Sequence, residues 1–183
     1  MKELSLNILD ITKNSVRAEA KNISILLNED EKGILTVIIE DDGIGMSKES
    51  LESATDPFFT TRKTRTVGMG IPLLKLACEQ AGGALKLESL SKDEDEDDHG
   101  TRLTATFDTN NIDCMPVGDM ASTIAVLIQG NPEIDYIFEH TMPNKTVKLS
   151  TGEIKAVLGE DIPLSSYEVL RWIKDYIDEQ YSA

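Results

Sequence analysis

The glycine pair Gly68 and Gly70 leads straight into an apolar segment, and this junction constrains the fold more than any other feature of the chain. The segment, at about 71–81, is predicted to be a helix, because Pro72 suits a first helical turn and Gly82 suits a C-terminal stop. A helix N-terminus presents unpaired N–H groups and partial positive charge, and glycines let a ligand come close. The junction is therefore suited to binding phosphate groups.

The stretch before the glycines, Thr55–Lys63, reads Thr-Asp-Pro-Phe-Phe-Thr-Thr-Arg-Lys. Its proline, its paired threonines and its scarcity of helix formers predict a loop or lid over 55–69. Basic side chains in this segment could close over a triphosphate and compensate its charge. The residues of the segment that we expect to contact a nucleotide are Thr60, Thr61, Arg62, Lys63, Gly68, Met69 and Gly70.

The chain is strongly acidic. It has 183 residues, with 18 Lys and Arg against 33 Asp and Glu, and a formal net charge of −15. This charge argues against binding to a nucleic-acid backbone or an anionic membrane. No apolar run approaches the roughly 18 residues of a membrane span and no N-terminal signal is visible, so we expect a cytoplasmic protein. The cysteines make no disulfide framework, and no Cys/His spacing typical of a metal site is present.

A polar pair lies on the first predicted helix, at 4–19. Asp10 and Asn14 are four residues apart and therefore share one helical face. The Asn14 amide oxygen would suit Mg²⁺, which keeps several waters and shares oxygens with phosphates. The Asp10 carboxylate, one turn earlier, could orient or deprotonate a nucleophile near that metal. A polar stripe on an amphipathic helix is more often simply its solvated face, so the pair alone decides nothing.

An acidic, glycine-rich pattern follows two predicted strands, at 23–27 and 35–40. It reads Asp41-Asp42-Gly43-Ile44-Gly45-Met46. The Asp41 carboxylate could accept a hydrogen bond from the N6 amine of adenine, and Gly43 and Gly45 could let the backbone approach the ring. Met46 could pack on the base or in the core. A plain Asp-Gly turn is the alternative interpretation.

A fourth pattern, Gly100-Thr101, opens a later predicted strand, where the Thr101 hydroxyl could join Asp41 and a water in reading adenine. Each pattern is weak or moderate alone, but the four follow one another in order between the expected elements. Together they resemble the N-box, the DxGxG box, the F-box with its lid, and the closing Gly-Thr of the GHKL superfamily. That superfamily includes sensor histidine kinases, type II topoisomerase subunits, mismatch-repair ATPases and heat-shock chaperones of the ninety-kilodalton class. The resemblance covers roughly residues 1–108.

The resemblance implies an α/β protein with the histidine-kinase-like ATPase fold, a two-layer α/β sandwich with a mixed sheet, and ATP and Mg²⁺ as cofactors. Within it, Asn14 would be the metal ligand, Asp41 the adenine-reading residue and Asp10 the catalytic residue. The chain departs from the family at Asp10, where the ATP-hydrolysing branches carry Glu, which is one methylene longer. As a whole, the chain looks like a small bacterial stand-alone histidine-kinase-like ATP-binding protein.

Complete sensor kinases carry a phosphoacceptor histidine, and we expect no equivalent of that residue in this chain. The resemblance begins at residue 1, and the two histidines, His99 and His140, are expected to lie at the surface. The favoured function is therefore a Mg²⁺-ATP-binding ATPase module that acts on a partner protein as an ATP-dependent regulatory switch. One alternative is a protein kinase acting in trans on a partner, as an anti-sigma-type or split sensor kinase would. Another is a non-catalytic ATP sensor. The oligomeric state is left open.

The character of the chain changes near residue 110. We assign 1–109 to the ATP-binding domain and 110–183 to a small C-terminal α/β domain or extension of unknown role. Further strands are expected at 85–90, 102–107, 134–138 and 147–149, an acidic loop at 92–99, and helices at 48–54, 120–129 and 167–181. Trp172 and Tyr176, on the last helix, could dock onto the first domain or onto a partner, but core packing is the expectation.

Overall fold

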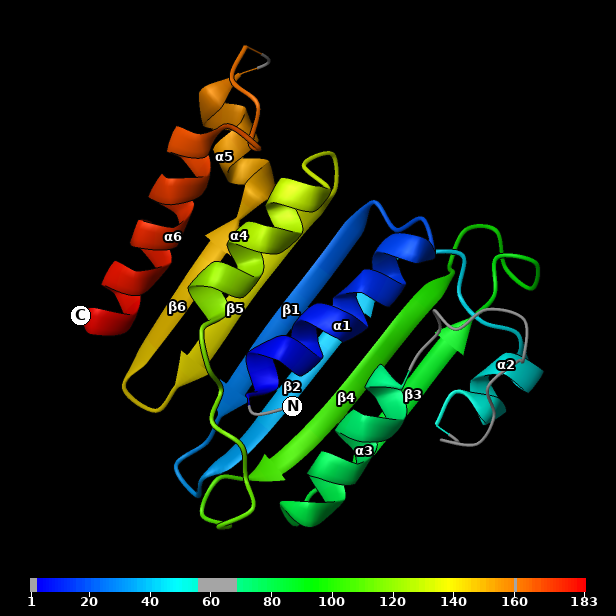
Figure 1. The fold of residues 1–183 in the computed structure, drawn as a ribbon. Helices are drawn as coiled ribbons and strands as arrows, with labels where there is room; N and C mark the ends of the chain where they lie inside the picture. Colours follow the sequence, from blue (N-terminus) through cyan, green and yellow to red (C-terminus); the bar gives the residue numbers. More distant parts are fainter. Residues whose placement is uncertain (1–2, 56–68, 160) are drawn as a thin grey trace.

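The computed structural model describes residues 3–55, 69–159 and 161–183. The strands are β1 (Asn22–Glu29), β2 (Ile34–Asp41), β3 (Leu85–Leu90), β4 (Gly100–Asp108), β5 (Asp135–Met142) and β6 (Lys145–Ser150). The helices are α1 (Leu4–Arg17), α2 (Lys48–Ser53), α3 (Gly70–Gln80), α4 (Met120–Gly130), α5 (Thr151–Leu158) and α6 (Tyr167–Ser182). The strands form one mixed sheet in the order β3-β4-β2-β1-β5-β6, as Figure 1 shows.

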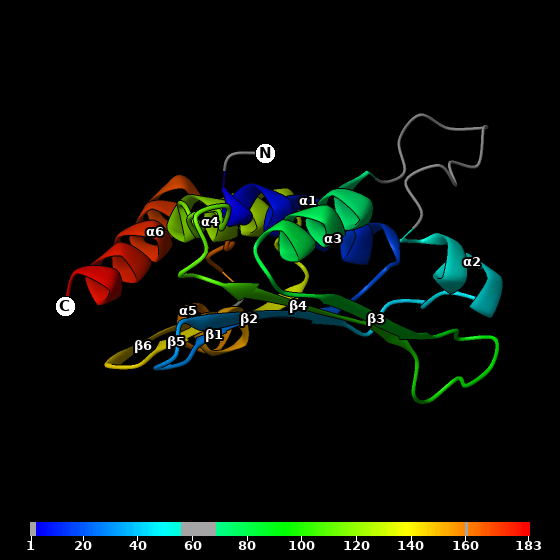
Figure 2. The same cartoon turned by 90° about the horizontal axis from the view of Figure 1, so that it is seen from below.

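The structure has two layers, because α1, α3, α4 and α6 lie across the same face of the sheet (Figure 2). The strands alternate accordingly: in β1 the residues that face the helices are buried, and those on the other face are partly exposed. The buried residues of β1 are Ile23, Ile25 and Leu27. The predicted α/β fold with a mixed sheet is therefore confirmed.

The predicted elements are present, with two differences, both in the second half of the chain. α5 was not expected, because it follows β6 without a glycine or proline between them; the Ser150 hydroxyl accepts a hydrogen bond from the Glu153 N–H and caps the helix instead. β5 runs on to Met142, past the predicted end at residue 138, because its pairing with β1 and β6 extends the strand through polar residues.

The strands of the C-terminal segment continue the sheet of the N-terminal segment. β5 pairs in parallel with β1, with Phe138 opposite Ile25, and β6 pairs antiparallel with β5. On the covered face, α4 packs beside α1 and α6 packs beside α4. The predicted domain boundary at residue 110 stays a prediction. The residues before it and the residues after it contribute strands to one hydrogen-bonded sheet. Among the helices of the described residues, none is long and apolar enough to cross a bilayer.

The expectation that His140 lies at the surface is wrong. His140 lies within β5, where its side chain is 3% exposed, because the strand extends beyond its predicted end and this residue faces α6. Its Nδ1 and the Tyr181 hydroxyl are 2.8 Å apart. Its Nε2 is buried and has no hydrogen-bond partner among the described residues. Burial lowers the pKa of His140 from its usual value, because a charged imidazole would lose its hydration there.

Stability should therefore fall as the pH drops through the ordinary pKa of histidine, about 6.5. Below that pH the unfolded chain binds a proton at His140 that the folded chain does not, so the free energy of unfolding decreases by at most about 1.4 kcal/mol per pH unit from this group. Urea unfolding at pH 7.5 and 5.5 measures the decrease. We expect a smaller decrease in His140→Gln. Equal decreases in both proteins would show that His140 does not couple folding to pH.

Candidate nucleotide-binding site

A row of polar side chains crosses three strands on the helix-covered face of the sheet. Thr101 of β4 lies opposite Asp41 of β2 on one side and opposite Ser89 of β3 on the other. The Ser89 and Thr101 hydroxyl oxygens are 2.9 Å apart, and Ser89 also accepts a hydrogen bond from the Met46 N–H at 2.9 Å. The pairing of these strands therefore brings the predicted Asp41, Met46 and Thr101 together at one end of the sheet.

Asp41 is oriented from two sides. The Ser15 hydroxyl of α1 donates to Asp41 Oδ2 at 2.5 Å, and the Gly43 N–H donates to Asp41 Oδ1 at 3.0 Å. Ser15 is only 4% exposed. The sequence analysis did not single out Ser15. A hydroxyl within the otherwise apolar stripe of α1, directly after Asn14, could have indicated that this side chain forms a buried hydrogen bond at the site. The two donors hold the carboxylate in one orientation.

The two neighbouring aspartates differ in environment. Burial raises the pKa of Asp41, and the hydrogen bonds from Ser15 and Gly43 only partly oppose this. Burial alone would also raise the pKa of Asp42, but hydrogen bonds from Asn22 and Lys21 outweigh it and lower that pKa. The Asp42 carboxylate accepts from the Lys21 N–H at 2.7 Å and from the Asn22 N–H at 2.8 Å. Asp42 therefore holds the start of β1, whereas Asp41 faces the polar row.

The polar pair of α1 lies beside the start of α3. Asp10 is exposed and Asn14 is half-buried. A Cβ placed on Gly70, the first residue of α3, would lie 3.7 Å from the Asp10 Cβ and 3.4 Å from the Ile11 Cδ1, so the two helices touch there. The Asn14 Oδ1 accepts a hydrogen bond from Arg17 at 3.0 Å. The N-terminus of α3, which can attract phosphates, thus lies next to Asp10.

The glycines of the DxGxG pattern fit tightly against neighbouring elements. A Cβ on Gly43 would lie 2.7 Å from the Ala18 carbonyl oxygen at the end of α1. Gly45, with φ +66°, approaches the Leu90 carbonyl so closely that any side chain would collide with it. His99 Nδ1 lies 2.6 Å from the Gly43 carbonyl oxygen, so this histidine is half-buried at the site. That the two glycines also let the backbone approach a base stays a prediction.

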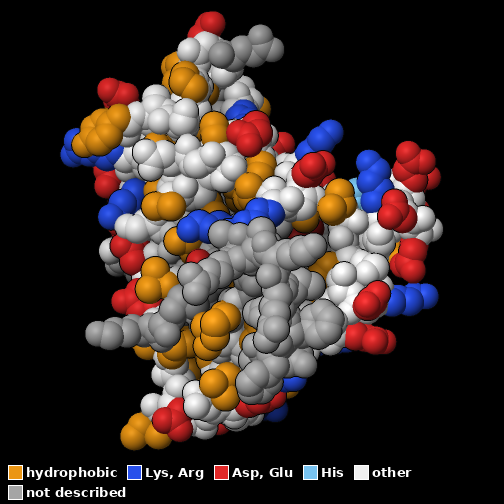
Figure 3. All heavy atoms as spheres, turned by 45° about the vertical axis from the view of Figure 1, so that its right-hand side comes forward, with side chains coloured by type: hydrophobic (Ala, Val, Ile, Leu, Met, Phe, Trp, Pro, Cys, Tyr) orange, Lys and Arg blue, Asp and Glu red, His pale blue; other side chains and the backbone are white. Residues whose placement is uncertain are grey.

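Several predicted residues lie outside the described part of the chain: Thr60, Thr61, Arg62, Lys63 and Gly68. Met69, immediately before α3, is 58% exposed. Acidic side chains are spread over the face seen in Figure 3, with separate Lys and Arg side chains among them. Among the described residues, no group of three or more His, Cys, Asp or Glu could hold a metal ion. A magnesium ion here would take most of its oxygens from phosphates and water, as is usual for this ion.

Comparison with solved structures supports the fold. The ATPase domain of MutL from Aquifex aeolicus, in complex with ADP, is 13% identical and superimposes with a TM-score of 0.54 over 86% of this chain and 69% of that chain. The N-terminal domain of a DNA repair protein is 18% identical, with a TM-score of 0.57 over 87% of this chain and 58% of that chain. Both likenesses extend well past residue 110, but at these identities they carry information on the fold alone.

Sequence comparison points to a family. The sensor histidine kinase ZraS of Salmonella typhi is 33% identical over 85 residues, which are 45% of this chain and 18% of ZraS. Sporulation kinase C of Bacillus subtilis is 30% identical over 90 residues, 49% of this chain and 20% of that kinase. The chain therefore matches about a fifth of each of these relatives. Residues 2–111 match the family described as "Histidine kinase-, DNA gyrase B-, and HSP90-like ATPase", and the chain belongs to this family.

Proposed function

We propose that this protein binds Mg²⁺-ATP and acts on a protein partner as an ATP-dependent regulatory switch. The observation that carries the proposal is the environment of Asp41: a carboxylate oriented by Ser15 and Gly43, facing Thr101, at the edge of a site that α1 and α3 complete. An ionised carboxylate has four lone-pair positions, so acceptor capacity for an adenine amine remains after those two hydrogen bonds. The match to the ATPase family supports the same assignment.

The residues around Asp41 fit the remaining parts of the ligand. The N-terminus of α3 at Gly70 would receive phosphate oxygens, and the predicted contacts of Arg62 and Lys63 would add positive charge. Asn14 would hold Mg²⁺ through its Oδ1, which is half-buried beside the site and accepts one hydrogen bond, from Arg17. The metal would neutralise phosphate charge. Asp10, exposed and next to Gly70, would orient or deprotonate an attacking water.

Two alternatives use the same residues. A kinase acting in trans would transfer the γ-phosphate to a partner, and a sensor would bind ATP without cleaving it. The kinases ZraS and sporulation kinase C, of which the chain matches about a fifth, favour the first of these alternatives. The shorter Asp10, where hydrolysing relatives carry Glu, favours the second. In both, the nucleotide would be held by Asp41 and Asn14.

The fate of the γ-phosphate tests the proposal. The purified protein is incubated with Mg²⁺ and γ-labelled ATP beside an Asp10→Ala variant of equal fold content. For a switch that hydrolyses ATP, free phosphate should form slowly in the wild type and fall by roughly 100-fold or more in the variant, the range expected when a general base is lost. Bound but unchanged ATP would favour a sensor or a kinase that lacks its partner. Failure to bind ATP would contradict all three functions.

Ser15→Ala should weaken ATP binding although Ser15 would not contact the ligand. Without the hydroxyl, Asp41 loses a charge-assisted hydrogen bond, which is worth about 1.5–3 kcal/mol, and its pKa should rise further. We expect an affinity loss of up to roughly 10-fold at pH 8 and a larger loss at pH 6. Calorimetric titrations at both pH values measure this. Ser15→Thr, which keeps the hydroxyl, is the control; a loss in Ser15→Ala that does not vary with pH would argue against this positioning role.

A further inference from the structure

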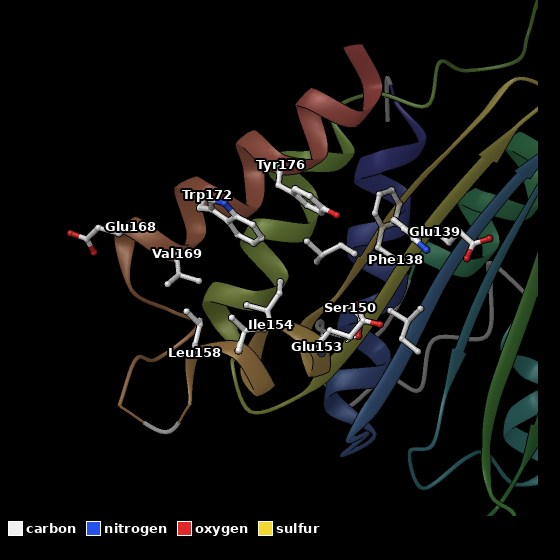
Figure 4. Close-up of a pocket in the computed structure, with 14 residues that line it drawn as sticks. Phe138, Glu139, Ser150, Glu153, Ile154, Leu158, Glu168, Val169, Trp172 and Tyr176 are labelled. Carbon is white, nitrogen blue, oxygen red and sulfur yellow. Dashed lines mark hydrogen bonds between the residues drawn. The ribbon is translucent and has the colours of Figure 1, made fainter. Parts of the chain in front are cut away.

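An open groove of about 760 Å³ lies between α5 and α6, beside the edge strand β6 (Figure 4). The groove lies at the β6 edge of the sheet, whereas the candidate nucleotide site lies on β2, β4 and β3, toward the opposite edge. Its lining is mainly apolar. The apolar side chains that line it are Ile137, Phe138, Leu149, Ile154, Val157, Leu158, Val169, Trp172 and Tyr176.

Four of the apolar side chains that line this groove are exposed: Ile137, Val157, Trp172 and Tyr176. The expectation that Trp172 packs in the core is wrong: its side chain is 51% exposed, and it stacks on Tyr176 with ring centroids 5.0 Å apart. Val157, facing the groove from α5, is 85% exposed. Trp and Tyr are enriched among the few residues that carry most of the binding energy at protein interfaces. Since helices at spacing i, i+4 place both rings on one face, α6 presents them together.

The edge strand itself is not free to accept another strand at its centre. The Gln180 side chain of α6 accepts from the Lys148 N–H at 3.0 Å and donates to the Lys148 carbonyl oxygen at 3.1 Å. These are the outward-facing backbone groups that an added strand would need. The Gln180 amide thus takes the place of a neighbouring strand. An occupant of the groove must bind through side-chain contacts, as an amphipathic helix does.

The rim of the groove is acidic. Three carboxylates border it, those of Glu139, Glu153 and Glu168, against a single lysine, Lys148. Within the described part of the chain, none of these three carboxylates has a Lys or Arg within ion-pair distance. A second copy of this chain, which also carries a charge of −15, would be repelled. The rim is complementary to a basic partner.

We propose that the groove binds an amphipathic helix of a basic protein partner. The helix would place apolar side chains against Trp172, Tyr176 and Val157, and its Lys or Arg residues against the glutamates of the rim. This surface lies in 137–176, beyond the residues that match the ATPase family, and the inference does not rest on the proposed nucleotide site. It assigns the C-terminal segment a role in choosing the partner.

Trp172 provides the measurement, because it is the only tryptophan of the chain. The full chain, without nucleotide, is titrated with a synthetic amphipathic helical peptide made of Leu and Lys, and the emission of Trp172 is followed. We expect a blue shift that saturates, since the ring leaves water when the helix binds. A peptide of the same pattern made of Leu and Glu should produce no shift. A shift of equal size with the acidic peptide would overturn the proposal.

Matched variants separate the groove from general attraction to an acidic protein. Glu168→Lys and Glu31→Lys change the net charge equally, but Glu31 is exposed in the turn between β1 and β2 and does not line the groove. Glu168→Lys should weaken peptide binding by about 5-fold or more, and Glu31→Lys by less than about 2-fold. Val157→Ser should also weaken it, through lost apolar contact. Equal effects of the two charge changes, or a dimer in sedimentation that Val157→Ser abolishes, would overturn the proposal.

Discussion

Asp41→Asn should lower the affinity for ATP by at least about 10-fold while the protein stays folded. The carboxylate is the acceptor proposed for the adenine amine, and an amide in its place carries no charge and offers only one acceptor atom. The fold should survive, because the Asn oxygen can still accept from the Gly43 N–H and the Ser15 hydroxyl can rotate to accept from the new amide. Titration calorimetry with a non-hydrolysable ATP analogue measures the affinity.

Asp42→Asn is the matched control. It removes the same charge one residue away, but the Asp42 oxygen that accepts from both Lys21 and Asn22 is retained as an amide oxygen. We expect a loss of stability of about 1 kcal/mol and an affinity change below about 3-fold. If Asp41→Asn binds the analogue as tightly as the wild type, or if both variants lose affinity equally, Asp41 does not read the base.

Phe138→Ala should destabilise the whole chain by about 3–5 kcal/mol, the usual cost of truncating a fully buried aromatic side chain. Phe138 is 0% exposed in β5 and lies opposite Ile25 of β1. Because that pairing joins the C-terminal strands to the N-terminal sheet, we expect a single unfolding transition. The emission of Trp172, in the C-terminal segment, and the far-UV circular dichroism of the entire chain should shift together.

Ile137→Ala is the control for this measurement. Ile137 neighbours Phe138 on the opposite, open face of the sheet and is 50% exposed, so its truncation should cost less than about 1 kcal/mol. Two transitions in Phe138→Ala, with the Trp172 signal lost first, would mean that residues 1–109 fold as a unit separate from the rest. One transition would mean that the C-terminal segment is an extension of the same cooperative unit.

The sequence alone predicted the elements with strong local signals. The apolar stripe of α1 repeats with helical spacing, and β1 and β2 are rich in β-branched residues between turn signals. Asp41 and Gly43 could be proposed as site residues because a carboxylate and a glycine at the end of a strand form a local pattern, and their roles stay predictions. These features depend on neighbouring residues in the chain, which a sequence displays directly.

The tertiary structure decided the contacts between distant residues. The hydrogen bond from Ser15 to Asp41 exists because α1 crosses the end of β2, and no local pattern shows that crossing. His140 is buried because β5 extends past residue 138 and this residue faces α6, where it contacts Tyr181. Trp172 is exposed on α6, where it lines the groove beside β6.

The sequence by itself thus determined the α/β class, the order of the motifs that resemble those of the ATPase family and the position of Asp41, the carboxylate proposed to read the base, because each is encoded within a few consecutive residues or a helical repeat. Only the tertiary structure decided that the C-terminal strands extend the same sheet, which hydroxyl orients Asp41 and which apolar residues remain uncovered. The physical reason is that strand pairing and helix packing join residues far apart in the chain, such as Ile25 and Phe138, whose contact depends on the path of the whole backbone.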